Sequence, residues 1–207
     1  MSFSGRQGER SRAGQKPEAV SGASDRRGPG VDVEYCHRVS GIFTVFPAAP
    51  GDGDTLGEIH AESWKAAYAG FFAQEFFDEA VRHRRHKWHA VLAENKDSVM
   101  LAALDGRPLA YSYFGVSPTG PETAELFGFY GHPDGWGTGI ANALMTASLD
   151  RLREEGFGRV HLWTLRDTPQ SRRFYAKSGF TESGAVRGHD FGDGNPIEQV
   201  EYELILR

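Results

Sequence analysis

The sequence predicts a mixed α/β fold, and two observations support this prediction. Between residues 123 and 165, a strand, a glycine-rich loop, a helix and a second strand follow one another. Such a βαβ unit places its two strands side by side and parallel. Upstream, the dipeptide Asp105-Gly106 separates two apolar runs, a pattern typical of an antiparallel hairpin. Parallel and antiparallel pairs together predict a mixed sheet.

The individual elements follow from local signals along the chain. A β-prone run at 42–46 is stopped by Pro47, and the carboxylates of Asp52 and Asp54 can cap a helix that Gly70 ends. Further helices are expected at 76–94, at 139–155 and from Pro169 to Gly179. Further strands are expected at 99–104, 109–116, 123–130, 160–165 and 200–206.

Composition divides the chain into two parts. Residues 1–40 are rich in Gly, Ser, Arg and Gln and carry very few aliphatic side chains. They cannot bury enough apolar surface to offset the entropy lost on ordering. We therefore expect 1–40 to be a disordered N-terminal extension and 41–207 to be the folded domain. The single cysteine, Cys36, lies in the extension, which argues against a disulfide framework or a cysteine-based zinc site.

Charge and hydropathy limit the classes of partner. The chain is 39% hydrophobic and 25% charged, with a formal net charge of -5. This balance suits a packed core but not a nucleic-acid binder, which is usually basic. No apolar run approaches the roughly 20 residues of a membrane span, and no apolar signal segment stands at the N-terminus. We expect a cytoplasmic protein without nucleic-acid or membrane partners.

The glycine-rich loop is a candidate anion site. Gly137 and Gly139 lie between the predicted end of a strand and the predicted start of a helix. Glycines let the backbone approach a ligand there, and the free N–H groups of the first helical turn attract an anion. Two rival phosphate motifs fail, because no Gly-Lys-Ser/Thr ending follows and Asn142 occupies the third glycine position of a dinucleotide loop. Glycines also form plain turns, so the loop alone leaves both interpretations open.

Three segments carry a specific resemblance. Residues 126–145, LFGFYGHPDGWGTGIANALM, resemble motif A of the GNAT superfamily of N-acetyltransferases, and residues 167–180, DTPQSRRFYAKSGF, resemble its motif B. Residues 60–70, HAESWKAAYAG, resemble the first helix of many bacterial members. The resemblance implies a mostly antiparallel twisted sheet with a central parallel βαβ unit and helices on both faces. It also implies an N-acetyltransferase domain over 41–207, with acetyl-CoA as co-substrate and no metal.

The resemblance also implies residue roles. Loop amides would hold the pyrophosphate of the cofactor, the strand end before the loop would bind the pantetheine arm, and motif B would add contacts. The implied cofactor-binding residues are Phe129, Tyr130, Gly131, Trp136, Gly137, Thr138, Gly139, Ile140, Ala141, Asn142, Thr168, Ser171 and Phe174. Four of them depart from the usual residue of the family: Trp136, Ala141, Asn142 and Thr168. A basic residue is common in the family where Asn142 stands, so one phosphate contact is expected to be missing, and Thr168 is expected to weaken one cofactor hydrogen bond.

Two side chains are candidates for the chemistry. By the resemblance, Tyr175 would lie near the thioester sulfur and protonate the departing thiolate, and a phenol of pKa about 10 suits a thiolate of pKa about 8.5. The attacking amine must first lose a proton, which calls for a carboxylate or an ordered water path. Glu125, near the start of the motif A strand and facing away from Leu126, is the best candidate. A solvated carboxylate at the strand end is the alternative interpretation.

The acceptor side is less well defined. Trp64 and Tyr68, four residues apart, would form a wall of the acceptor site, although two core aromatics fit the same spacing. Three histidines within 83–89 stand among Arg and Lys, and we interpret this stretch as a solvated basic face without a metal. His189-Asp190 is interpreted as a surface pair, with the rim of the acceptor pocket as the alternative.

The predicted function is transfer of an acetyl group from acetyl-CoA to a primary amine of a small molecule, a peptide or a protein. Without a well-placed cysteine, direct attack in a ternary complex is expected rather than a covalent acyl-enzyme. The alternative function is a non-catalytic acyl-CoA-binding regulatory module. The identity of the amine, the preferred acyl chain and the formation of a homodimer are left open.

Overall fold

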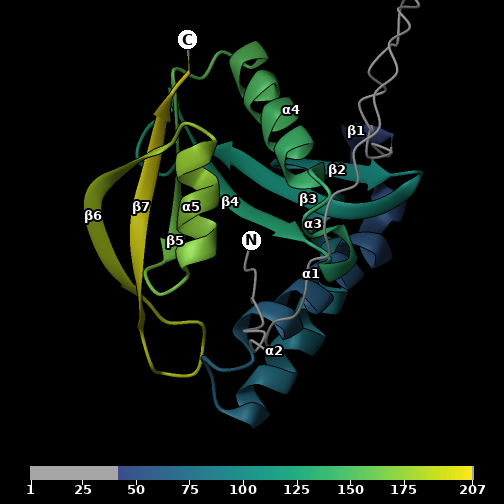
Figure 1. Ribbon diagram of the computed structural model, residues 1–207, viewed down its shortest axis with the longest axis vertical. Coiled ribbons are helices and arrows are strands. Elements are labelled where there is room, and N and C mark those ends of the chain that lie inside the picture. The colour runs from purple at the N-terminus through teal and green to yellow at the C-terminus, as the bar shows by residue number, and fades with distance from the viewer. Residues whose placement is uncertain (1–41, 207) are drawn as a thin grey trace, which may run out of the picture. The chain divides into compact units, whose positions relative to one another are not determined.

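The computed structural model describes residues 42–206 (Figure 1). The predicted disordered extension at 1–40 lies outside the described residues. The strands are β1 (Phe43–Pro47), β2 (Ser98–Leu104), β3 (Arg107–Val116), β4 (Thr123–Gly131), β5 (Arg159–Leu165), β6 (Thr181–His189) and β7 (Ile197–Ile205). The helices are α1 (Gly53–Tyr68), α2 (Gln74–His86), α3 (Trp88–Glu94), α4 (Ile140–Glu154) and α5 (Pro169–Lys177), with short 3-10 turns η1 (Pro50–Asp52) and η2 (Pro133–Gly135).

The strands form one sheet in the order β1-β2-β3-β4-β5-β7-β6. All neighbouring pairs are antiparallel except β4 and β5, which are parallel and are joined through α4. The mixed α/β fold with a mostly antiparallel sheet and a central parallel βαβ unit is therefore confirmed. The hairpin expected at Asp105-Gly106 connects β2 and β3.

The central strands separate towards their carboxyl ends. β4 and β5 pair only at Thr123 with Arg159, Ala124 with Val160, and Glu125 with His161. Beyond Glu125 the register of β4 against β3 shifts, and Phe127 is the extra residue of this bulge. A bulge bends its strand and increases the local twist. The facing edges of β4 and β5 are consequently open from residue 126 and residue 162 onward, in the middle of the sheet.

Helices cover both faces of the sheet (Figure 1). Along a strand, alternate side chains point to opposite faces. Leu101 packs with Leu56 of α1 and Trp88 of α3, whereas its neighbour Ala102 belongs to the core under α4, with Leu144. Within residues 42–206, no helix has both the length and the apolar character needed to cross a bilayer.

The structure differs from the expected elements in two places. The helical region expected at 76–94 is two helices, α2 and α3, that meet at Lys87. No Gly or Pro stands there, and the break accompanies the burial of Trp88 against His60 and Tyr111. β6 had no predicted bounds, because it is exposed along nearly its whole length and so carries no apolar alternation.

The close approach of α1 to α2 depends on Gly57. A methyl group at this position would overlap the backbone carbonyl of Arg85. We expect Gly57→Ala to lower the free energy of unfolding by about 2 to 3 kcal/mol, because packed helices must move apart to admit the extra carbon. Chemical denaturation measures this loss. Gly70→Ala is the matched control, since nothing lies within 4 Å of its added carbon, and an equal loss in both variants would contradict the explanation.

Candidate active site

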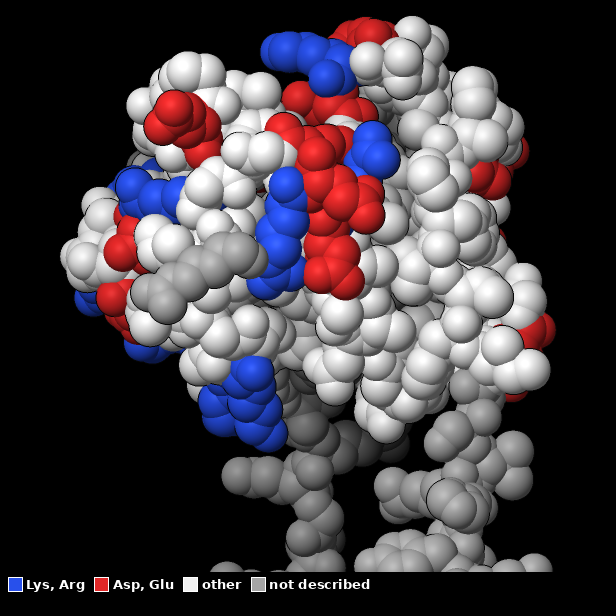
Figure 2. All heavy atoms as spheres, turned by 90° about the horizontal axis from the view of Figure 1, so that it is seen from above, with Lys and Arg blue, Asp and Glu red and all other residues white. Residues whose placement is uncertain are grey.

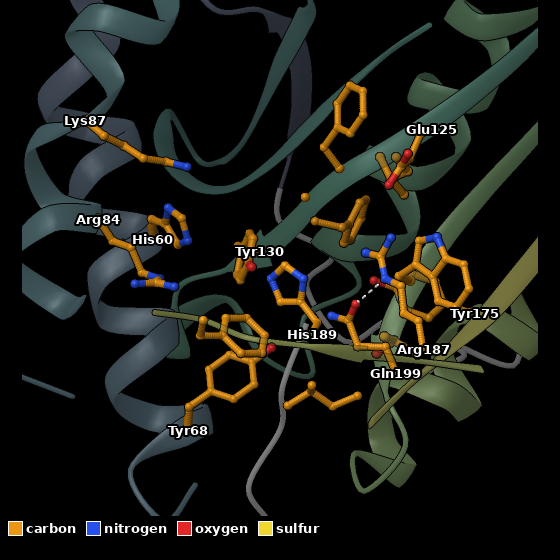
Figure 3. Close-up of a pocket in the computed structure, with 18 of the residues that line it drawn as sticks. His60, Tyr68, Arg84, Lys87, Glu125, Tyr130, Tyr175, Arg187, His189 and Gln199 are labelled. Atoms are coloured by element: carbon orange, nitrogen blue, oxygen red, sulfur yellow. Dashed lines mark hydrogen bonds between the residues drawn. The ribbon is translucent and has the colours of Figure 1, made fainter. Parts of the chain in front are cut away.

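A cleft of 360 Å³ opens where β4 and β5 separate (Figure 3). Its walls come from α1, α2, β4, β5, α5 and the hairpin of β6 and β7. The lining residues are His60, Tyr68, His83, Arg84, Lys87, residues 125–130, residues 163–165, Tyr175, Arg187, His189, Phe191 and Gln199. The volume lies at the lower end of the range for small-ligand sites, about 300–1,000 Å³.

Glu125 lies at the apex of the gap, in the last β4 residue that pairs with β5. Its side chain is 14% exposed and lines the cleft. Oε2 lies 3.7 Å from Nε2 of the buried His161, whose Nδ1 lies 2.8 Å from Oε1 of Glu201. The hydroxyl of Ser117 lies 2.7 Å from the same Nε2. The carboxylate therefore reaches the cleft with a polar network behind it, unlike a freely solvated strand-end group.

Tyr175 enters the cleft from the opposite face of the sheet. It is 5% exposed, and its ring contacts Phe174, Phe180 and Tyr202. Burial raises the pKa of its phenol well above the ordinary value, and Tyr68 and Tyr130 add to the effect. Within residues 42–206 its hydroxyl makes no hydrogen bond. The phenol is thus held protonated, with its donor available to a ligand in the cleft.

The glycine loop follows the open end of β4. Gly137 has φ +77° and Gly139 φ +97°, both in the region that favours glycine. The hydroxyl of Thr138 donates to the carbonyl of Gly135 and accepts from the amide of Ile140, and Trp136 Nε1 donates to the carbonyl of Gly131. Within the described residues, the amides of Gly137, Gly139 and Ala141 have no partner. Side chains hold the loop, while backbone donors at the start of α4 stay available to an anion.

The motif B residues lie at the start of α5. Thr168 is buried and donates to the carbonyl of Leu165, so its hydroxyl proton is used within the chain. Ser171 is also buried. Phe174 contacts Phe129 across the space between α5 and β4, with ring centroids 5.4 Å apart. Asn142 lines a second hollow between α4 and α5, together with Phe174.

The two predicted acceptor-site aromatics have different positions. Tyr68 lines the cleft, but Trp64 is 1% exposed and does not. Trp64 instead supports Arg84, a residue of the cleft wall, whose guanidinium stacks on the Trp64 ring at 3.1 Å from the centroid. The Tyr68 ring also contacts Trp64, with ring centroids 4.7 Å apart. Trp64 is therefore a core aromatic, and the role of Tyr68 as a wall of the acceptor site stays a prediction.

Two interpretations of polar residues hold only in part. Arg84 and Lys87 line the cleft, because α2 turns this side towards β4, whereas His86 and His89 are exposed, as expected of a solvated face. His189 also lines the cleft, whereas Asp190 is exposed and accepts the amides of Gly192 and Gly194. In the described part of the chain, no group of three or more His, Cys, Asp or Glu residues could hold a metal ion.

Sequence reasoning also missed Arg187, Gln199 and His60. Arg187 donates from Nε to Gln199 at 2.8 Å and stacks on Trp163 at 4.2 Å from the ring centroid (Figure 3). His60 is 4% exposed and contacts Tyr130. No local sequence signal marks these residues. Only the packing of α1, β6 and β7 in the folded domain brings them to the cleft.

The class of protein is indicated by a gap between parallel strands, with a glycine loop of unpaired backbone amides at one end and a buried tyrosine beside the gap. Such a site can hold a phosphorylated cofactor whose tail enters the sheet. The chain belongs to the acetyltransferase (GNAT) family, whose model matches residues 57–180. The match spans both the βαβ unit and α5, and it confirms the family predicted from the sequence.

Curated relatives carry different acceptor names. The chain is 33% identical over 150 residues to mycothiol acetyltransferase of Sanguibacter keddieii, covering 66% of this chain and 47% of the relative. It is 26% identical over 159 residues to spermidine N(1)-acetyltransferase of Thermoplasma acidophilum, covering 73% and 92%. The chain thus spans about half the length of the first relative.

Solved structures share the fold. The PaiA N-acetyltransferase of Thermoplasma acidophilum, solved in complex with coenzyme A, superimposes with a TM-score of 0.63 at 21% identity, covering 79% of this chain and 99% of that one. YncA of Salmonella typhimurium, solved with acetyl-CoA, gives a TM-score of 0.59 at 19% identity, covering 80% and 94%. At these identities the likeness concerns the fold.

Proposed function

We propose that this chain transfers an acetyl group from acetyl-CoA to a primary amine. The observation that carries the proposal is the cleft at the gap between β4 and β5, which brings Glu125 and Tyr175 together from opposite faces of the sheet. The pyrophosphate would bind the amides of residues 137–142, and the pantetheine arm would follow the open edge of β4 at 129–131. Phe174, Thr168 and Ser171 would shape the other side of that path.

The chemistry is direct transfer in a ternary complex. Glu125 accepts a proton from the amine, and the nitrogen then attacks the thioester carbonyl. As the tetrahedral intermediate collapses, the carbon–sulfur bond breaks, the nitrogen loses its second proton to solvent and Tyr175 donates a proton to the departing sulfur. Tyr175 then regains a proton from solvent. The products are the N-acetylated amine and coenzyme A. No step needs a metal or a covalent acyl-enzyme.

The alternative function is a non-catalytic acyl-CoA-binding module that regulates a partner. The polar network behind Glu125 and the available hydroxyl of Tyr175 favour catalysis, because binding alone needs neither. The two functions differ in one measurement. A catalyst releases free coenzyme A thiol only when an amine acceptor is present, whereas a binding module releases none.

Acetyl-CoA titration with a loop variant tests the cofactor site. Nothing lies within 4 Å of a carbon added at Gly137, so this open space is where a bound pyrophosphate would lie. We expect Gly137→Ala to weaken acetyl-CoA binding by about tenfold or more, because a methyl group obstructs close approach of the phosphates and the backbone angle becomes strained. Isothermal calorimetry measures acetyl-CoA binding, and thiol release with an amine panel then measures turnover.

Gly106→Ala is the matched control for this variant. Gly106 has φ +82° and equally open space, but it lies in the hairpin of β2 and β3. Both variants should lose similar stability, and only Gly137→Ala should lose affinity. Wild-type affinity in Gly137→Ala would remove the loop from the cofactor site, and a wild-type protein that binds no acetyl-CoA would refute the proposed function.

A further inference from the structure

Three cationic side chains of the cleft have no acidic partner within ion-pair distance in residues 42–206. Arg84 donates to the carbonyl of Ala80 and stacks on Trp64, and its buried Nε has no hydrogen-bond partner. Lys87 lies over Trp88, with Nζ 5.0 Å from the ring centroid. Arg187 is held by Gln199 and stacks on Trp163. Each cation is thus positioned by aromatic and neutral groups.

Within residues 42–206, cations outside the cleft are mostly paired. Arg151 lies 2.7 Å from Glu155, and Arg153 lies 2.8 Å from Asp150. Figure 2 shows basic and acidic side chains intermixed over one end of the molecule. By contrast, Glu125 is the only carboxylate among the described lining residues. The cleft therefore carries an excess of positive charge, although the formal charge of the whole chain is negative.

Burial makes this excess costly in the empty protein. It lowers the pKa of the Arg84 guanidinium, and burial with the nearby Arg84 charge lowers the pKa of the Lys87 ammonium. A partly buried cation without a counter-ion destabilises the fold, and an anion placed against it recovers that energy. The arrangement of the cleft suits a negatively charged ligand.

His60 adds a neutral donor to the same wall. Its Nδ1 accepts the Trp88 indole N–H at 3.2 Å, and desolvation lowers its pKa well below the ordinary value. In a neutral imidazole whose Nδ1 accepts, Nε2 carries the hydrogen. That Nε2 is buried without a partner, in a side chain 4% exposed that lines the cleft. This unpartnered donor is a second indication of a ligand acceptor atom.

We infer that the acceptor is a small amine that carries a carboxylate or phosphate group, with its anion bound at the wall of His60, Arg84 and Lys87 and its amine directed at Glu125. This inference rests on the proposed acetyl transfer. The cofactor pyrophosphate would not neutralise these cations, because the loop at 137–142 proposed to bind it does not line the cleft. A polyamine is disfavoured, since its charges would meet Arg84 and Lys87 with one carboxylate to offset them. The cleft volume of 360 Å³ suits an acceptor of about amino-acid size.

Matched amine pairs test the inference. Thiol release from acetyl-CoA is measured with L-alanine and L-alaninamide, with β-alanine and β-alaninamide, with phosphoethanolamine and ethanolamine, and with spermidine. We expect kcat/KM to favour the anionic member of at least one pair by about tenfold or more, because hydrogen bonds between charged groups are roughly twice as strong as neutral ones. Amino-acid amides have the less basic amine, so chemical reactivity alone would favour the amide. Carboxylate and phosphate pairs distinguish the two kinds of anion.

Lys87→Met should lower this preference by about tenfold or more, through a rise in KM of the anionic acceptor. Lys96→Met is the matched control, since Lys96 is exposed and outside the cleft, and it should keep the preference. Arg84→Gln repeats the test on the neighbouring cation. Calorimetric titration of the same amines in the presence of coenzyme A gives a readout that does not need turnover.

The outcomes separate the inference from the proposed function. Equal or better use of amides or spermidine, with thiol release intact, overturns the anionic acceptor and leaves acetyl transfer standing. Binding of acetyl-CoA without binding or acetylation of any anionic amine also overturns it. Failure to bind acetyl-CoA refutes the proposed function itself.

Discussion

Replacing Tyr175 with Phe is expected to lower kcat by about 10²- to 10⁴-fold, the usual contribution of a positioned acid or base. Acetyl-CoA affinity should stay unchanged, because the ring keeps its contacts with Phe174, Phe180 and Tyr202. The lost hydroxyl is the only donor that this side chain supplies to the cleft. Steady-state thiol release at saturating substrate measures kcat, and calorimetry measures the affinity.

The physical basis is the protonation state of the phenol. Burial raises its pKa well above the ordinary value, so Tyr175 is neutral over the whole working range of pH. A neutral phenol can donate to sulfur while negative charge develops there, when the hydrogen bond is strongest. The interaction therefore acts mainly in the transition state, which is why kcat rather than binding should fall.

Tyr202→Phe is the matched control for this variant. Tyr202 belongs to the same core, but its hydroxyl contacts Arg172 and Glu182 and its side chain does not line the cleft. It should lose some stability and keep kcat. Wild-type turnover by Tyr175→Phe would exclude the phenol as the acid, and a joint loss of folding and binding would assign it a structural role.

The sequence predicted the parts of the site that are local. Gly137, Gly139 and the helix start after them lie within a few residues of one another, so the chemistry of the loop can be derived from the chain alone. The same holds for the parallel neighbours β4 and β5, because a strand, helix and strand in succession have few ways to pack. Tyr175 followed from the resemblance of motif B.

The cationic wall could not be predicted in the same way. Arg84 and Lys87 have the spacing of an ordinary solvated helix face, and their sequence neighbours Arg82 and Arg85 pair with Glu79 and Glu62. Only the packing of α2 against α1 turns one side of the helix towards β4. Arg187 reaches the cleft from β6. This strand shows no alternation of buried and exposed residues, because it is exposed almost throughout. Contacts between elements far apart in the sequence leave no periodic signal.

Replacing Glu125 with Gln is expected to lower kcat/KM by about 10²-fold or more near neutral pH. Gln keeps the shape and the position at the apex of the gap but cannot accept the proton of an ammonium group. The amine, with a pKa near 10, is almost fully protonated at neutral pH, so its deprotonation must be assisted. A pH profile of kcat/KM from weakly acidic to alkaline pH measures the loss.

The shape of that profile separates a base from a binding group. In the wild type, kcat/KM should rise with pH and level off as base and amine become deprotonated. In Glu125→Gln the rise should move to alkaline pH, towards the pKa of the free amine of about 10, where the two enzymes approach each other. Glu203→Gln is the control, because Glu203 lies on β7, pairs with Arg159 and does not line the cleft. A profile of unchanged shape and height in Glu125→Gln would assign proton removal to water or to the polar network around His161.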